Sequence, residues 1–360
     1  MSNGFNPTYS ISPRLLENIK QITLLINELN QAKLTRIVLL NLEENARQVS
    51  TYSSTAIEGN PLPLTAVKKI LKNQPNHLRD TEQEITNYNE ALIYLRNYNQ
   101  TAKLDFKTKT QEKASVNLKL ILEIQKIVML KLLPKAKLGK LRKEPVFVNN
   151  PQTGKTIYWP PDHHEVPKLI NELINFTSKN THILDPIILA GIFHKQFVVI
   201  HPFIDGNGRC TRLLTKHLLA NLGLNTFHLF SFENYYNQNV TEYFQLVGIR
   251  GNYYDIYKKL DFSEWLEYFS SGIIDELLRI RPFIKQESIN PKNTLEKHDK
   301  KILDYINKHG FITDKIYSSL TERAKATRSL DFQKLIQLDL IQKLGKGPAT
   351  YYKLINKSFT

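Results

Sequence analysis

The sequence has a single cysteine, Cys210, among its 360 residues. One cysteine excludes an intramolecular disulfide and a zinc site built from several cysteines, and it favours a reducing cytoplasm as the compartment. The chain also lacks any apolar run approaching the roughly 20 residues that span a bilayer. Its polar first 13 residues lack the apolar core of a signal peptide. We therefore expect a cytoplasmic protein without contact to a membrane.

Acidic residues are scarce relative to basic ones, and the formal net charge is +15. The excess is uneven, because residues 291–360 contain 14 Lys/Arg and 7 Asp/Glu, and residues 101–145 contain 12 Lys/Arg and 4 Asp/Glu. Basic clusters of this kind are candidates for contact with polyanions. For residues 101–145, a solvated lysine-rich surface is the simpler interpretation.

Apolar residues recur at steps of three and four along most of the chain, which predicts a mainly α fold. We expect helices near residues 15–29, 37–42, 51–60, 64–73, 80–98, 115–132, 165–178, 185–200, 209–224, 233–248, 250–258 and 261–281. The pattern breaks at residues 146–161, where alternating residues around a turn at 150–154 predict a β-hairpin.

A change in composition at residues 282–294, with Pro282 and Pro291, predicts a linker. Three short helical patterns and a strand, glycine-rich turn and strand follow it, which is the order of a winged helix-turn-helix. We therefore expect four parts: an N-terminal helical region (1–110), a helical catalytic core with a β-hairpin flap (111–281), a linker (282–294) and a small α+β winged helix (295–360).

Residues 201–212, HPFIDGNGRCTR, bring together the groups that phosphoryl chemistry needs. The Asp-Gly-Asn-Gly turn precedes a helix, whose N-terminal amides and positive dipole end form an anion site. Arg209 and Arg212 lie one helical turn apart and can face the same phosphate. Asp205 beside them could hold Mg²⁺. His201 titrates near neutrality and could take a proton from a hydroxyl.

Each of these residues has an ordinary structural explanation when it is considered alone. A lone histidine is usually structural, a Gly-x-Gly segment is usually a turn, and an aspartate near an arginine usually forms a salt bridge. Their combination within twelve residues favours the functional interpretation.

The segment resembles the motif of the Fic family, His-x-Phe-x-(Asp/Glu)-Gly-Asn-Gly-Arg-x-x-Arg, at every fixed position. The resemblance extends over residues ~10–280 and includes segments 138–176, 191–203 and 263–273. Leu141 stands where many members have tyrosine, which should affect packing only. The resemblance implies a helical fold and transfer of AMP from ATP to Ser, Thr or Tyr hydroxyls of a target protein and of the enzyme itself.

The resemblance also implies a role for each residue of the motif. His201 would be the general base, and Asp205 would bind Mg²⁺ or Mn²⁺ between the α- and β-phosphates of ATP. Gly206, Asn207 and Gly208 would cradle the phosphates. Arg209 and Arg212 would hold the β- and γ-phosphates and stabilise the departing pyrophosphate.

Further residues follow from the same resemblance. Phe203 would seat the loop, and Cys210, at a variable position, would be a small packed residue rather than a nucleophile. A family variant with a bulkier turn phosphorylates its targets, so Gly-Asn-Gly here favours nucleotidyl transfer.

The resemblance also assigns the contacts with the target and the nucleotide. The hairpin would align the target as an added strand, through Ile157, Tyr158 and Trp159. The candidates for the adenine and ribose pocket are Tyr236, Asn237, Tyr253 and Tyr254. The simpler alternative is that these residues are core, because aromatic residues at helical spacing usually are.

Residues 54–60, STAIEGN, resemble the inhibitory motif of the family, (Ser/Thr)-x-x-x-Glu-(Gly/Asn), through Ser54, Glu58 and Gly59. The resemblance implies that an inhibitory helix over about residues 45–60 lies within the N-terminal helical region. Glu58 would pair with Arg212, which then could not hold the γ-phosphate, so ATP would bind unproductively. The simpler alternative is an ordinary glutamate at a helix end. In some relatives this glutamate positions water for AMP removal, so an AMP-removing enzyme is an alternative function.

Two other functions remain open. In a DNA-binding regulator the winged helix would contact phosphates and bases, through Arg323, Lys325, Arg328 and Lys346. A winged helix is also commonly a protein-interaction or dimerisation module, and relatives often form homodimers. A toxin with a separate antitoxin is less favoured, because this chain carries its own inhibitory segment. The intact catalytic segment makes the enzyme the primary hypothesis.

Overall fold

The computed structural model describes residues 4–355 except 33, 35, 74, 76, 105–115, 150–153, 223–230, 290–294, 338–339 and 346. Within these residues the protein is mainly helical, with a few short strands, which confirms the fold class that the apolar periodicity predicts. Contacts divide the chain into two compact units. One consists of Met1–Gln31 and Glu43–Arg281, and the other of Ala32–Leu42 and Pro282–Thr360.

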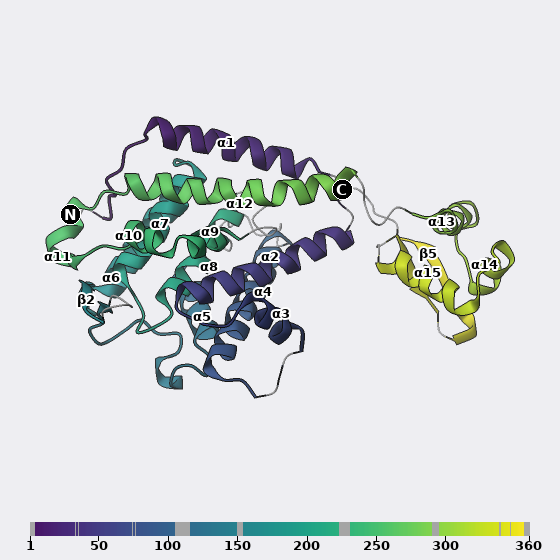
Figure 1. Ribbon diagram of the computed structural model, residues 1–360, viewed down its shortest axis with the longest axis horizontal. Helices are drawn as coiled ribbons and strands as arrows, with labels where there is room; N and C mark the ends of the chain where they lie inside the picture. Colours follow the sequence, from purple (N-terminus) through teal and green to yellow (C-terminus); the bar gives the residue numbers. More distant parts are fainter. Residues whose placement is uncertain are drawn as a thin grey trace. The chain divides into compact units, whose positions relative to one another are not determined.

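The first unit is built around α7 and α8, which pack against each other, while α4 and α5 cover α8 (Figure 1). Helix α7 is apolar on nearly all sides and is buried along almost its whole length, as expected of a central helix. The helices of this region are α1 (Pro13–Asn30), α2 (Arg36–Ile57), α3 (Leu64–Asn73), α4 (Asp80–Leu104), α5 (Leu118–Val128), α6 (Val166–Asn180), α7 (Pro186–Ile200), α8 (Asn207–Asn221), α9 (Phe232–Gln238), α10 (Val240–Val247), α11 (Tyr253–Ile256) and α12 (Ser263–Ile289).

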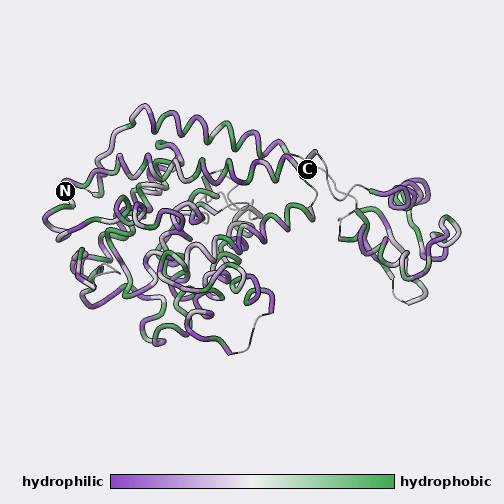
Figure 2. Tube along the Cα trace, viewed as in Figure 1, coloured by the Kyte–Doolittle hydropathy of each residue, from purple (hydrophilic) through white to green (hydrophobic). Residues whose placement is uncertain are grey.

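Helices α1 and α12 lie side by side although they are far apart in the sequence (Figure 1). Helix α1 begins with Pro13 after Ser12, whose hydroxyl caps the helix by accepting from the amide of Leu15. Figure 2 shows apolar residues recurring along α1, as in an amphipathic helix. The Asn18 amide donates to the Ser270 hydroxyl of α12 at 2.9 Å, which ties the two helices together.

The expected hairpin is present, but it belongs to a larger sheet. Strand β1 (Val148–Asn149) pairs antiparallel with β2 (Thr156–Trp159), and the expected turn at 150–154 lies mostly outside the described residues. Strand β3 (Gly251–Asn252), in a stretch predicted as helix, pairs parallel with β2. The strand order β1-β2-β3 therefore makes β2 the central strand.

Several helix boundaries differ from those expected from the sequence. The helices expected near 37–42 and 51–60 are one continuous helix, α2. The segment predicted as one helix at 233–248 is divided into α9 and α10 at Asn239, whose backbone is non-helical (φ −129°, ψ 53°). Helix α12 continues through Pro282 to Ile289, so the stretch predicted as a linker starts as helix and then passes outside the described residues. Proline already has a helical φ, but inside a helix it removes one backbone hydrogen bond and its ring crowds the carbonyl four residues earlier.

The second unit contains three helices followed by a two-stranded antiparallel hairpin, in the order that the sequence predicts. Its core contains Ile302, Tyr317 and Phe332, and the Phe332 ring stacks on Tyr352 with centroids 4.0 Å apart. Its elements are α13 (Lys297–His309), α14 (Asp314–Leu320), α15 (Lys325–Gln337), β4 (Ile341–Leu344) and β5 (Tyr351–Leu354). Among the helices of the described residues, none has the length and apolar character needed to cross a membrane.

Candidate active site

The loop between α7 and α8 is held in one shape by its own residues. Gly206 has φ +84°, a left-handed conformation that favours glycine, and a Cβ at this position would lie 2.9 Å from the Met129 sulfur. The Asn207 side chain accepts from the amide of Phe203 and donates to its carbonyl, both at 2.9 Å. Phe203 is buried and its ring packs 6.1 Å from that of Phe197.

This geometry corrects the role expected for Asn207. Both ends of its side chain are used by the Phe203 backbone, so the side chain closes the loop instead of reaching towards a phosphate. What the residue can offer an anion is its backbone amide in the first turn of α8, where amides have no partner within the helix. Cys210 is buried and burial raises the pKa of its thiol, which agrees with a packed residue and not a nucleophile.

His201 ends α7 in a left-handed conformation, with φ 51°. Its Nδ1 lies 3.3 Å from the Val198 carbonyl oxygen. A carbonyl can only accept, so Nδ1 carries the proton and Nε2 keeps a lone pair. Burial lowers the pKa of His201 to about 4, so the ring is neutral at pH 7. A neutral imidazole with a free Nε2 is the form required of a general base.

Arg142 fixes the start of the loop, and we did not single it out from the sequence. The side chain is buried, and its Nε donates to the His201 carbonyl at 2.8 Å. Its backbone amide donates to the Pro202 carbonyl at 2.9 Å. The signal was present in the sequence, because Arg142 lies in the segment LGKLRKE that resembles the family, but its partner His201 lies 59 residues further along the chain.

The two arginines of the motif each face carboxylates. Arg209 Nη2 donates to Asp205 Oδ1 at 3.2 Å, and Nη1 lies 3.2 Å from Oε1 of Glu84 on α4. Within the described residues, Nε and Nη1 of this buried guanidinium have no partner with the geometry of a hydrogen bond. Unmet donors on a buried charged group at a helix N-terminus indicate a site for an anion.

Arg212 is fully buried and is enclosed by the end of α2. Its Nη2 donates to Glu58 Oε1 at 2.6 Å and to the Ser54 carbonyl at 2.9 Å, and its Nε donates to the Ser54 hydroxyl at 2.7 Å. Burial acts to raise the pKa of Glu58, but the Arg212 and Arg209 guanidinium groups hold it below its usual value. The pair is therefore fully charged at pH 7.

The Glu58 carboxylate also lies directly over the turn that leads into α8. A Cβ built on Gly208 would collide with Glu58 Oε1. The carboxylate thus occupies the space above the first turn of α8, where the amides and the helix dipole attract anions.

A second set of contacts holds α2 against α8, one helical turn from the contacts of Arg212. Ser50 lies one turn before Ser54 on α2 and donates to the buried Glu233 carboxylate at 3.0 Å. Lys216 lies one turn after Arg212 on α8 and is 3.1 Å from the same carboxylate. Tyr88 on α4 also donates to it, at 3.0 Å. Residues four apart share a helix face, so Ser50, Ser54 and Glu58 on one side and Arg212 and Lys216 on the other form one continuous line of contacts. We call it the α2–α8 seam, and the two helices run antiparallel along it.

The four residues proposed for an adenine and ribose pocket do not line one pocket. Tyr236 is fully buried and stacks on Tyr243, with centroids 4.6 Å apart, so it is a core residue. Asn237 is half-buried on α9. Tyr253 and Tyr254 line a separate cleft of about 390 Å³ beside residues 4–8, and its lining contains no residue of segment 201–212.

The β-hairpin flap (β1 and β2) was expected to present a free strand edge to the target, but β2 is the central strand of a three-stranded sheet. The Tyr158 side chain is buried and donates to the Val199 carbonyl at 2.7 Å, so it anchors the flap. Tyr158 already pairs with Val148 of β1 and Gly251 of β3, which leaves no free edge at this residue. An added strand needs an unpaired edge, so Ile157–Trp159 cannot all receive a target in this way. Trp159 is exposed and remains a contact candidate.

The basic residues expected to contact DNA are largely paired within the second unit. Arg328 donates to both oxygens of Asp314, at 2.8 and 3.0 Å, and Arg323 Nε lies 2.9 Å from Asp331 Oδ2. Lys325 is exposed, and Lys346 lies outside the described residues. Contact of either arginine with DNA would have to compete with its carboxylate partner.

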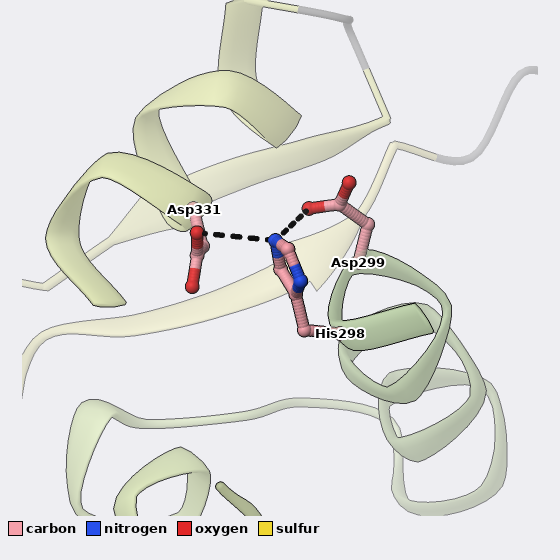
Figure 3. A group of neighbouring side chains, drawn as sticks. All are labelled: His298, Asp299 and Asp331. Atoms are coloured by element: carbon pink, nitrogen blue, oxygen red, sulfur yellow. Dashed lines mark ion pairs between the residues drawn. The ribbon is translucent and has the colours of Figure 1, made fainter. Parts of the chain in front are cut away.

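One cluster in this unit has the composition of a metal site. Figure 3 shows His298 between Asp299 and Asp331, with Nε2 3.6 Å and 3.4 Å from the two carboxylates. Lys334 already donates to Asp299 at 2.6 Å, and Arg323 pairs with Asp331. A metal ion would have to compete with both cations, so the cluster is better described as a network that joins α13 to α15.

Comparisons with known proteins agree with the geometry of the first unit. The model of the Fic/DOC family matches residues 115–219. The protein adenylyltransferase Fic of Nematostella vectensis is 31% identical over 176 residues, which are 48% of this chain and 37% of that protein. The probable protein adenylyltransferase of Aquifex aeolicus is 31% identical over 164 residues, which are 41% of this chain and 49% of that protein. The chain thus matches less than half the length of these curated relatives.

Solved structures share the fold at lower identity. A Fic family protein from Desulfovibrio desulfuricans has a TM-score of 0.62 and 19% identity, over 98% of this chain and 99% of its own. A Fic domain containing signaling protein from Bacteroides thetaiotaomicron has a TM-score of 0.56 and 21% identity, over 76% of this chain and 98% of its own.

Proposed function

Residues 115–219 of this chain form a domain of the Fic/DOC family, and from this premise we propose that the protein transfers AMP from ATP to hydroxyl groups of a protein. The curated relatives that match are named protein adenylyltransferases, which supports this activity. The observation that carries the proposal is a site made by His201, whose Nε2 keeps a lone pair, and two arginines in the first two turns of α8.

The residues of the site divide the reaction between them. His201 Nε2 takes the proton of the target hydroxyl as its oxygen forms a bond to the α-phosphorus of ATP. The bond from that phosphorus to the bridging oxygen breaks, and pyrophosphate leaves with the electron pair. Arg209, Arg212 and the first amides of α8 stabilise the negative charge that grows on the departing group.

Asp205 fits the role of a ligand for Mg²⁺ or Mn²⁺. Both hydrogen bonds to its carboxylate, from Gly206 and Arg209, go to Oδ1, so Oδ2 could bind a cation. The side chain is 54% exposed at the mouth of the turn, where one carboxylate plus phosphate oxygens is the usual arrangement for Mg²⁺. The bound ion would neutralise charge on the phosphates.

We propose further that Glu58 inhibits this activity. Its carboxylate occupies Arg212 and the space above Gly208 at the same time. A triphosphate would need both, because the γ-phosphate requires Arg212 and the cradle requires the amides of α8. ATP can then bind only in an unproductive position. The seam through Ser50, Lys216 and Glu233 supports this proposal, because it holds α2 in place.

The direct test is mass spectrometry of the purified protein after incubation with ATP and Mg²⁺. We expect an added AMP on the protein itself, and a stronger signal when Glu58 is replaced. The same assay separates the alternative function, because a protein that chiefly removes AMP would lose the modification from a previously modified sample. The absence of any added AMP in both the wild type and the Glu58→Gly variant would contradict the proposal.

The pKa of His201 leads to a prediction about pH. A base works in its neutral form, and a pKa of about 4 keeps His201 neutral down to about pH 5. We expect kcat/KM of the Glu58→Gly variant, at saturating Mg²⁺, to stay constant within about twofold from pH 5.5 to 8 and to fall only below this range. A decline centred near 6.5, the ordinary value for histidine, would contradict the buried environment of His201.

Removal of the second unit's helices and hairpin should leave the chemistry intact. No residue of the proposed active site lies in 295–360, so we expect a chain ending at 289 to modify itself at a rate within about twofold of the full-length protein. Binding to duplex DNA, if the full chain has it, should disappear and should be steeply salt-dependent. A large loss of AMP transfer upon truncation would assign this part a direct role in the reaction.

A further inference from the structure

A chain of hydrogen bonds begins at Arg212 and passes through three helices of the core. Arg212 Nη1 donates to the Tyr243 hydroxyl of α10 at 3.4 Å. The same hydroxyl lies 3.1 Å from Nε2 of His194 on α7. His194 Nδ1 lies 3.1 Å from the hydroxyl of Thr215, which donates to the Thr211 carbonyl at 2.8 Å. All five residues are buried, and only Arg212 stands at a fixed position of the motif.

The two ends of this chain determine the direction of every hydrogen bond in it. A guanidinium can only donate and a carbonyl can only accept. Thr215 uses its single hydroxyl proton on the Thr211 carbonyl, so it accepts from His194 Nδ1–H. His194 Nε2 is then an acceptor and takes the Tyr243 proton. The Tyr243 oxygen consequently presents its lone pairs to Arg212, and for a neutral imidazole this is the only arrangement in which all four contacts are hydrogen bonds.

The neutral state of His194 agrees with this assignment. Burial, followed by the charge of Arg212, lowers the pKa of His194 well below its usual value. An imidazolium would carry a proton on Nε2 as well, and the Tyr243 hydroxyl would have to turn its proton away from the ring. The buried position therefore selects the neutral ring with the proton on Nδ1.

Tyr243 differs from the other acceptors of Arg212 in the element that supplies it. The Ser54 hydroxyl, the Ser54 carbonyl and the Glu58 carboxylate all belong to α2 or to the residue that follows it. Tyr243 belongs to α10 and is buried in the core. When Glu58 is replaced, Arg212 loses its charged partner but keeps the two Ser54 bonds from α2 and the Tyr243 bond from α10. Of these, only the Tyr243 bond does not depend on the position of α2.

We propose that Tyr243, oriented by His194, is a positioning residue that keeps Arg212 aimed at the phosphates of ATP when Glu58 does not hold it. The proposal rests on the proposed function. A buried arginine that is held in place needs no reorganisation as charge develops on the leaving group, which is how preorganised donors accelerate a reaction.

The structure offers a matched control for the obvious alternative, which is that Tyr243 only fills the core. Tyr236 stacks on Tyr243 and is equally buried, yet among the described residues its hydroxyl has no hydrogen-bond partner. Tyr243→Phe and Tyr236→Phe therefore remove the same atom from neighbouring rings. Only the first removes an acceptor of Arg212.

The test compares these two variants in the Glu58→Gly background, in which the site is released. We expect Tyr243→Phe to lower kcat for AMP transfer about tenfold and to raise the Kd of ATP several-fold, measured by calorimetry. Tyr236→Phe should change each within about twofold. In a background that also carries Arg212→Ala, Tyr243→Phe should have no further effect. Equal losses from the two phenylalanine variants, or an undiminished loss without Arg212, would overturn the proposal.

The tautomer of His194 gives a readout that does not depend on AMP transfer. Histidine ¹⁵N NMR of the full-length protein should show His194 neutral and protonated on Nδ1, with the resonance assigned by comparison with a His194→Gln variant. A proton on Nε2 would break the chain and overturn the proposal even in an active enzyme. If Glu58→Gly transfers no AMP at all, the proposed function fails, whereas the calorimetry and the tautomer still decide whether Tyr243 positions Arg212.

Discussion

Replacing Glu58 by glycine should raise ATP-dependent AMP transfer and self-modification by about tenfold or more. The substitution removes the carboxylate that lies 2.6 Å from Arg212 Nη2 and over Gly208. A charge-assisted hydrogen bond of this kind contributes about 1.5–3 kcal/mol, and each 1.4 kcal/mol corresponds to about tenfold in an equilibrium. The measurement is incorporation of label from α-labelled ATP at equal protein concentrations.

Two controls locate the cause of this increase. Glu82 lies on α4, and its carboxylate pairs with the exposed Arg79 instead of an arginine of the motif, so Glu82→Gln should leave the rate unchanged. The double variant Glu58→Gly with Arg212→Ala should lose the increase, because the released arginine is the group that binds the phosphate. If the single variant is no more active than wild type, Glu58 is a structural residue. If the double variant remains as active as the single one, inhibition does not act through Arg212.

Replacing His201 by alanine should abolish transfer in the Glu58→Gly background while the fold is retained. A general base contributes typically 10²–10⁴-fold, which would bring transfer close to the limit of detection. The side chain makes one hydrogen bond, to the Val198 carbonyl, whereas the loop is held by backbone contacts to Arg142 and by Asn207. Far-ultraviolet circular dichroism and thermal unfolding should therefore remain close to those of the parent.

The comparison for this variant is His182→Ala, which removes an exposed histidine in the loop before α7 and should not alter the rate. ATP binding provides a second check, because the phosphate site formed by α8, Arg209 and Arg212 is intact in His201→Ala. We expect the Kd of ATP to stay within about threefold of the parent, so that the effect lies in kcat. Equal labelling of His201→Ala and its parent would refute the assignment of the base.

Local patterns predicted much of what was found in the first unit. The mainly helical fold is confirmed, and the model of the Fic/DOC family matches residues 115–219, because apolar periodicity and an unbroken motif are properties of neighbouring residues. The roles of the residues in 201–212 stay predictions that the variants above would test. The same kind of reasoning assigned Tyr236 to a pocket, and it failed there because the burial of an aromatic ring depends on the elements packed around it.

The residues between 201 and 212 were recognisable from the sequence because the base, the carboxylate, the turn and the arginines follow one another along the chain. Their partners lie far away along the chain and are brought near only by helix packing, and the sequence predicted one of them, Glu58, through the inhibitory motif. Glu58 and Arg212 are 154 residues apart, and Tyr243 reaches Arg212 from α10. A short motif resembled the first of these contacts, and Arg142 lies in a segment that resembles the family, but no local pattern marks Tyr243 or His194.

Sequence order also could not reveal how a side chain is used. Asn207 bonds to the backbone of Phe203 because the buried loop leaves that amide and carbonyl without other partners. Strand β2 has no free edge at Tyr158, because β3, far along the chain, pairs with the side that β1 does not cover. The groups available for chemistry in this protein were thus encoded in consecutive residues. Tertiary packing decided which of these groups remain available to a substrate, because buried polar groups must find hydrogen-bond partners wherever the fold supplies them.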